Sequence, residues 1–138
     1  MAQRRLLYLD EDMPKRLATE LRFRGRNATS IHSDGRAGTL DPDLVTSLVQ
    51  RFGSEVVLVT ANESMPVEHA DVLRETAITV AVIDGAHSDV HQDAWKRETV
   101  HRWAHVMEEQ EPGTVRRYSP KTQGIWRRRR RQPQLRLN

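Results

Sequence analysis

Short apolar segments alternate with amphipathic helical segments through most of the chain, and this alternation constrains the fold more than any other feature. The segments between the apolar runs carry apolar residues three and four positions apart, as helices that cover a sheet do. An order of strand, helix, strand, helix favours a parallel sheet with helices on both faces. The sequence therefore predicts an α/β domain with a mostly parallel central sheet. The expected strands are residues 6–9, 27–31, 55–60 and 78–84.

Prolines, glycines and acidic residues indicate where the helices begin and end. Pro14 suits the first turn of a helix with Asp12 as its cap, and Gly25 marks the end of that helix. Asp41, which precedes a proline, has the position of a cap for a second helix. Residues 88–110 have the composition of a long polar helix with two tryptophans on one side. The first two helices each join two expected strands, as crossovers in a parallel sheet do.

Charge is divided unevenly along the 138 residues, whose formal net charge is +3. Residues 1–110 hold 13 Lys and Arg against 18 Asp and Glu, which gives −5, while residues 111–138 hold 9 against 1, which gives +8. The second part has little periodicity and three of the six prolines. We therefore expect one α/β domain over residues 1–110 and a flexible basic tail over residues 111–138.

The composition also bears on the cellular compartment in which the protein is expected. Cysteine is absent, which rules out disulfides and thiolate metal sites. The apolar runs are shorter than the roughly 20 residues that a membrane span needs, and the first residues lack the pattern of a signal peptide. The sequence therefore predicts a cytoplasmic protein without a membrane segment.

Oxygen ligands follow the expected strands. Asp10 ends the first strand, Asn62 follows the third and Asp84 ends the fourth, while Asp41 opens the second helix. Because ligands of open α/β sheets bind beyond the carboxyl ends of the strands, these side chains can meet at one rim. Such ligands suit Mg²⁺ or Mn²⁺, and a metal-bound water can attack a phosphodiester. We predict that Asp10, Asp41 and Asp84 are the catalytic acids and that Asn62 is a further metal ligand. Local capping and turn roles are the alternative.

A run of arginines beside Trp126 marks the basic segment. Arginine contacts phosphate and releases counterions, and an aromatic ring stacks on unpaired bases, so this run predicts RNA binding. An arm that docks on an acidic partner and a solubilising tail are the alternatives. The run consists of Arg127, Arg128, Arg129, Arg130 and Arg131.

Two stretches resemble a known family. "LYLDEDMPKRLATELRFRG" (residues 7–25) and "HSDGRAGTLDPDLVTSLVQRFGSEVVLVTANE" (residues 32–63) are similar to the small PIN-like proteins of prokaryotes. Those proteins have a strand, an Asp-Glu-Asn or Asp-Glu-Asp triplet, a Leu-Pro and an amphipathic helix, then an Asp that opens a helix and a strand ending in Thr-x-Asp-x-Asp. The resemblance covers residues 5–85. It implies a three-layer PIN-like fold, a Mg²⁺- or Mn²⁺-dependent endoribonuclease activity, and a role as the toxin of a toxin–antitoxin pair.

The third acidic motif departs from that pattern. By position, Asp10 matches the first metal-binding acid and Asp41 the acid that opens the second helix. Asn62 and Ser64 stand where the family has two aspartates. Asparagine ligates a cation through its carbonyl oxygen without contributing charge, so we expect weak metal binding unless Asp84 supplies the missing charge.

The expected function is a hydrolase acting on RNA, with an antitoxin protein and a second copy of the chain as further possible partners. The alternative is a catalytically degenerate PIN-like module that binds RNA or protein. Haloacid-dehalogenase-type phosphatases share the "LYLDED" and "VLVTAN" patterns, but a catalytic lysine and a later acidic pair cannot be placed. Response-regulator receivers have their phosphoacceptor aspartate where this chain has Asn62.

Overall fold

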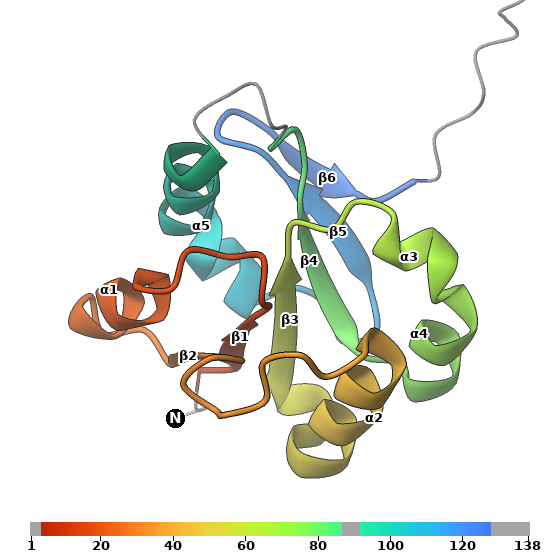
Figure 1. The fold of residues 1–138 in the computed structure, drawn as a ribbon. Coiled ribbons are helices and arrows are strands. Elements are labelled where there is room, and N and C mark those ends of the chain that lie inside the picture. The colour runs from red at the N-terminus through yellow and green to blue at the C-terminus, as the bar shows by residue number, and fades with distance from the viewer. Residues whose placement is uncertain (1–3, 87–91, 128–138) are drawn as a thin grey trace, which may run out of the picture.

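The computed structural model describes residues 4–86 and 92–127, which form a sheet covered by helices on both faces (Figure 1). Six strands lie in the order β2-β1-β3-β4-β5-β6. The first five in this order run parallel, and β6 pairs antiparallel with β5. The expectation of an α/β fold with a mostly parallel sheet is thus confirmed. The strands are β1 (Leu6–Leu9), β2 (Ala28–Ser30), β3 (Val56–Thr60), β4 (Thr79–Ile83), β5 (Val115–Tyr118) and β6 (Gln123–Ile125).

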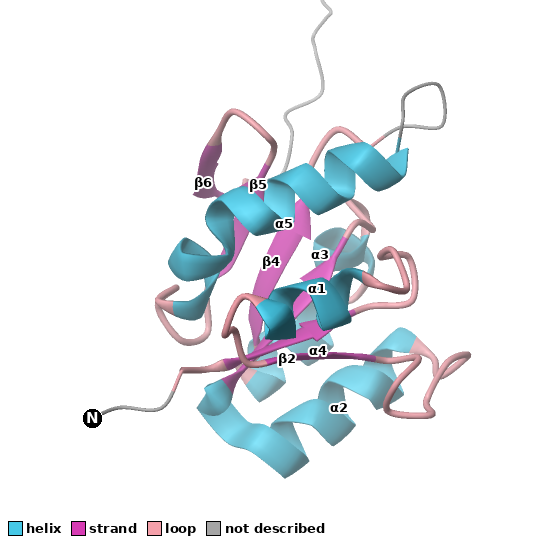
Figure 2. Ribbon diagram, turned by 90° about the vertical axis from the view of Figure 1, so that its left-hand side faces the viewer, coloured by secondary structure: helices cyan, strands magenta, loops and turns pink. Residues whose placement is uncertain are grey.

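The helices form the two outer layers. In Figure 1, α1 and α5 lie on one side of the sheet and α2, α3 and α4 on the other, and Figure 2 is seen from the side of α1 and α5. A short 3₁₀ helix, η1 (Gly53–Glu55), follows α2. Residues 88–91 of the expected last helix lie outside the described part of the chain. The α-helices are α1 (Leu17–Phe23), α2 (Asp41–Phe52), α3 (Met65–Glu68), α4 (Ala70–Thr76) and α5 (Gln92–Glu108).

Alternate residues of the central strands point to different cores. In β3, Val57 and Val59 face the core under α1 and α5, whereas Leu58 faces the core under α2 and α4. Both β3 and β4 are buried at every position. Strands covered on both faces need apolar residues throughout, which explains why these two segments were evident in the sequence.

Two of the expected helix starts differ from the structure. The first helix begins at Leu17, with Arg16 at the cap position, because the carboxylate of Asp12 accepts the Ala61 N–H instead of capping a helix. The second helix begins at Asp41 itself, and Leu40 occupies the cap position. Asp12 is therefore oriented by a main-chain contact outside α1.

The last two strands belong to the sheet. Tyr118 in β5 is fully buried, and its hydroxyl donates to Oε1 of Gln110 at 2.9 Å. The indole of Trp103 on α5 donates to the carbonyl of Ser119 at 2.7 Å. The division that the sequence suggested after residue 110 therefore falls inside the fold. The remainder of the expected tail, residues 128–138, lies outside the described residues.

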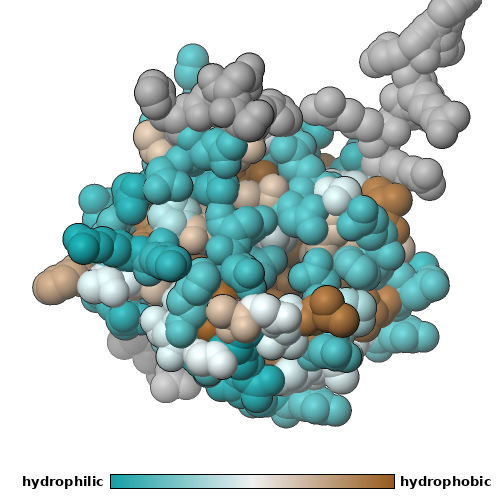
Figure 3. Space-filling model, viewed as in Figure 1, coloured by the Kyte–Doolittle hydropathy of each residue, from teal (hydrophilic) through white to brown (hydrophobic). Residues whose placement is uncertain are grey.

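The outer surface is predominantly polar. The face seen in Figure 3 is mostly hydrophilic, and its hydrophobic side chains form small, separate patches. Among the residues that the structure describes, no helix combines the length and the apolar character needed to cross a bilayer.

Candidate functional site

A cleft opens at the carboxyl ends of β1 and β3. The helix that follows β1 covers one face of the sheet and the helices that follow β3 cover the other, so these neighbouring strands form a topological switch point (Figure 1). Ligands of doubly wound sheets bind at such points. The cleft has a volume of about 540 Å³, and its lining includes Asp10, Asp12, Asp41, Asn62 and His69. Three of the four expected metal ligands thus line one cleft.

Asp10 is the most perturbed acid of the cleft. It is 7% exposed, its N–H donates to the carbonyl of Val59 at 2.9 Å, and its Oδ1 accepts the N–H of Glu11 at 2.8 Å. The pKa of Asp10 is raised to about 6, chiefly by burial and secondly by the charge of Asp12, with a smaller contribution from the charge of Asp41. An acid in this environment carries its charge at a cost, which is a frequent property of functional groups.

The other two acids of the triplet bind the main chain. Oε1 of Glu11 accepts the N–H of Gly38 at 2.6 Å, which ties the loop before α2 to the end of β1. The carboxylate of Asp12 accepts the N–H of Ala61 at 3.1 and 3.2 Å, which joins the ends of β1 and β3. Glu11 and Asp12 therefore hold the walls of the cleft together.

Asn62 is engaged within its own loop. Its side-chain oxygen Oδ1 accepts hydrogen bonds from both the N–H of Ser64, at 3.2 Å, and the hydroxyl of Ser64, at 2.8 Å. Its N–H donates to Oγ1 of Thr60 at 3.1 Å. Two aspartates at positions 62 and 64 would repel each other and favour a cation, whereas Asn62 and Ser64 satisfy each other. The oxygen expected to ligate a metal is already an acceptor of two hydrogen bonds.

His69 belongs to the cleft although the sequence did not indicate it. It lies between α3 and α4, and its Nε2 is 3.6 Å from Oδ2 of Asp41. Both side chains are 27% exposed. A lone histidine 28 positions from its partner has no spacing signal, because the contact arises only when α4 packs on α2.

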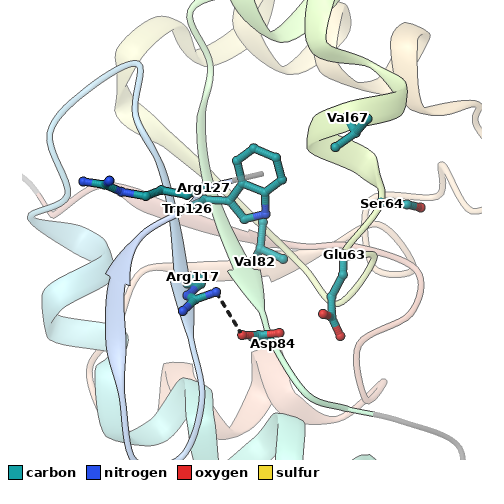
Figure 4. A pocket seen from close by; sticks show the side chains of 8 residues that line it. All are labelled: Glu63, Ser64, Val67, Val82, Asp84, Arg117, Trp126 and Arg127. Atoms are coloured by element: carbon teal, nitrogen blue, oxygen red, sulfur yellow. Dashed lines mark ion pairs between the residues drawn. The ribbon is translucent and has the colours of Figure 1, made fainter. Parts of the chain in front are cut away.

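Asp84 lies elsewhere. It follows β4 and lines a second pocket, where its Oδ2 is 3.8 Å from Nη1 of Arg117 on β5 (Figure 4). Its N–H donates to the carbonyl of Tyr118 at 2.7 Å. The structure thus does not bring Asp84 into the lining of the cleft with Asp10 and Asp41.

The oxygen ligands that the cleft offers do not fit the divalent ion that the PIN resemblance implies. Within residues 4–86 and 92–127, no three His, Cys, Asp or Glu side chains are placed so that they could hold a metal ion. Asn62 does not complete a set, because Ser64 occupies its oxygen. Mg²⁺ requires several oxygen ligands in near-octahedral geometry, which this arrangement does not provide.

Lys96 is hydrogen-bonded to the turn that carries the acidic triplet, residues 10–12. It is 8% exposed on α5, and its ammonium donates to the carbonyl of Asp12 at 2.5 Å. Burial raises the pKa of Asp12, and the charge of Lys96 partly offsets this rise. A buried lysine rarely occurs without a compensating partner, so Lys96 is a positioning residue for the turn that carries Asp10 and Asp12.

Replacing Lys96 should weaken the fold measurably. Lys96→Met keeps the side-chain length but leaves the Asp12 carbonyl without this donor, so we expect a loss of roughly 1–3 kcal/mol in the free energy of unfolding. Chemical denaturation measures this loss. Lys15→Met, at an exposed lysine, is the matched control and should change stability by less than about 0.5 kcal/mol. Equal effects of the two substitutions would show that Lys96 does not support the turn.

Of the expected RNA-binding arginines, Arg127 is described and lines the second pocket with Trp126. Arg128, Arg129, Arg130 and Arg131 lie outside the described residues.

Comparison with protein-family models, with curated proteins and with solved structures gives no match. The fold and the cleft define the class as a doubly wound α/β protein with an acidic crevice at its switch point.

Proposed function

We propose that this chain is a PIN-like RNA-binding protein whose acidic cleft lacks the metal-binding set of a PIN ribonuclease. One observation carries the proposal: Oδ1 of Asn62 accepts two hydrogen bonds from Ser64 at the position where the family has a pair of aspartates. Asp12 and Glu11 are likewise bound to main-chain N–H groups. The cleft therefore retains Asp10 and Asp41 at the positions of the family's acids but lacks the two aspartates that follow the third strand of the family.

The basic C-terminal segment supports RNA as the partner. Residues 111–138 carry a charge of +8, and Arg117, Trp126 and Arg127 surround one pocket beyond the ends of β4 and β5. Arginine binds phosphate and tryptophan stacks on bases, a combination typical of proteins that bind single-stranded nucleic acid. The acidic cleft repels phosphate, so RNA is expected to contact the basic segment instead.

A metal-dependent ribonuclease, with the toxin role that the resemblance implies, is the second candidate. The charges around Asp10 favour it. Burial is the largest cause of the raised pKa of Asp10, but the charges of Asp12 and Asp41, which add to the rise, would also attract a cation. The two candidates differ in whether a divalent ion binds the cleft of the unaltered protein.

Restoring the two aspartates distinguishes them. We expect the double substitution Asn62→Asp with Ser64→Asp to strengthen Mn²⁺ binding by at least about tenfold, because one charge pair near a protein surface is worth several kcal/mol at close range. Isothermal titration of Mn²⁺ into both proteins measures this. Asn62→Gln with Ser64→Ala is the matched control, since it breaks the same hydrogen bonds without adding charge.

Cleavage of a labelled single-stranded RNA, with Mn²⁺ and with a chelator, completes the test. The proposal predicts that the unaltered protein binds this RNA without cutting it. Mn²⁺-dependent cleavage by the unaltered protein, lost in Asp10→Asn, would instead establish the ribonuclease. Failure to bind the RNA under either condition would contradict both candidates.

A further inference from the structure

A second pocket lies beside the acidic cleft. It has a volume of about 370 Å³ and is separated from the cleft by the loop after β3, since Asn62 lines the cleft while the next two residues line this pocket. Figure 4 shows Trp126 and Val67 on opposite sides of it, with Glu63 and Asp84 toward the same end. A ligand pocket typically measures about 300–1,000 Å³, so the volume suits one nucleotide.

Trp126 provides a fixed aromatic wall. Its main-chain N–H donates to the carbonyl of Val115 at 3.0 Å, which holds the main chain at this residue against β5, and its side chain packs on the apolar core under α2 and α4. The residue is only partly buried and lines the pocket. An indole held on one side by the core and open on the other is suited to stacking on a planar base.

The carboxylates provide hydrogen-bond acceptors at one end. Oε2 of Glu63 accepts the N–H of Gly85 at 3.1 Å, so the main chain after β4 fixes the direction of this side chain. A carboxylate held in this way matches a base edge with two adjacent donors. Guanine has such an edge in its N1–H and N2 amino groups, whereas uracil presents a single N–H between two carbonyl oxygens.

Arginines supply positive charge at the rim. Arg117 is 47% exposed, and its contact with Asp84 at 3.8 Å is long and solvated. Such an ion pair contributes little, so a phosphate can compete for the guanidinium. Arg127 is exposed and also lines the pocket. Acceptors at one end, an aromatic wall and cations at the rim correspond to the base edge, the base face and the phosphate of a nucleotide.

We propose that this pocket binds one unpaired guanine nucleotide of a single-stranded RNA. Trp126 stacks on the base, Glu63 accepts hydrogen bonds from its N1–H and N2 amino groups, and Arg117 contacts its phosphate. The proposal rests on the RNA-binding function inferred above and adds base specificity to it.

Two labelled oligonucleotides of equal length test the proposal on the full chain. One is a uridine decamer, and the other has a single central guanosine. Both carry the same number of phosphates, so the arginine run contributes equally to each and cancels in the comparison. We expect the guanosine-containing RNA to bind about fivefold to tenfold more tightly in fluorescence anisotropy, a gain typical of one stacked and hydrogen-bonded base.

Substitutions in the pocket locate the preference. Glu63→Gln and Trp126→Leu should each reduce it to less than about twofold, and Trp126→Phe should retain most of it because stacking survives. Arg117→Gln should weaken both oligonucleotides. Arg24→Gln, at an exposed arginine on the C-terminal cap of α1, removes the same charge and should leave the preference unchanged. Thermal melting confirms that each variant is folded, and Glu63→Gln decides if Trp126→Leu is not.

The outcomes separate this inference from the proposed function. Equal binding of the two oligonucleotides, or a preference that survives in Glu63→Gln, overturns the guanine pocket while RNA binding stands. Absence of binding to both oligonucleotides overturns the proposed function and the pocket together.

Discussion

Deleting residues 116–138 should abolish cooperative folding, whereas deleting only residues 128–138 should leave the protein folded. The longer deletion removes β6 and all of β5 except Val115, exposes the edge of β4 and takes Tyr118 out of the core. Loss of one such aromatic side chain costs about 3–5 kcal/mol, against a total stability of about 5–15 kcal/mol for a domain. The missing strand pairing adds to this cost, so the remaining chain should not fold.

Circular dichroism during thermal melting checks both truncations. The longer one should lose its cooperative transition, and the shorter one should melt within a few degrees of the full chain because the sheet is complete through Ile125. A cooperative transition after deletion of residues 116–138 would show that β5 is dispensable.

The shorter truncation also removes most of the charge of the arginine run. It takes away four of the five arginines of the run, all but Arg127, together with Arg136, which changes the formal net charge from +3 to −2. Affinity for single-stranded RNA should therefore fall, and the salt dependence should become shallower by about 0.7 for each lost phosphate contact. Binding across a salt series measures both quantities. An unchanged slope would show that these arginines do not contact phosphate.

Replacing Asp10 by asparagine should stabilise the protein at neutral pH. The pKa of Asp10 is raised from 3.8 to about 6, chiefly by burial, so the ionised form is disfavoured in the folded state. A shift of about two units corresponds to roughly 3 kcal/mol, which Asp10→Asn should largely recover at pH 7. Chemical denaturation at that pH measures the gain.

The stability of the unaltered protein should also depend on pH in a direction set by the raised pKa of Asp10. Between the unfolded and folded pKa values the folded state binds more protons, so the stability of the unaltered protein should fall as pH rises from about 4 to about 6 and level off above that range. Asp10→Asn should lack this contribution. Asp43→Asn, at an exposed acid in the first turn of α2, is the matched control and should change stability by less than about 0.5 kcal/mol. A destabilised Asp10→Asn variant at pH 7 would mean that the Asp10 carboxylate makes a net favourable contact.

A buried acid whose ionised form is disfavoured has a functional interpretation when it lies at the end of a central strand. Proteins retain such groups where function requires them, and their removal often increases stability. Asp10 is therefore the residue of the cleft whose charge is least explained by the fold, even though the described residues do not form a complete metal set around it.

The sequence by itself determined the central strands, their parallel direction and the placement of Asp10, Asp41 and Asn62 at one rim of the sheet. Fully buried strands must be apolar throughout, and residues at the strand ends of a parallel sheet meet at one rim, so both features are readable from local pattern. The strand "VRRY" of β5 was missed because it is charged and carries one buried anchor, Tyr118, and its place depends on pairing with β4.

Only the tertiary structure decided what the acids of the cleft contact. Asp12 meets Ala61, Glu11 meets Gly38, His69 meets Asp41, and Asp84 turns to Arg117 in the neighbouring pocket. The residues of these pairs are 27 to 49 positions apart in the sequence, so no helical or strand period would reveal them. Sequence periodicity reports which face a residue occupies, whereas hydrogen bonds and ion pairs depend on how the loops beyond the strands pack against one another.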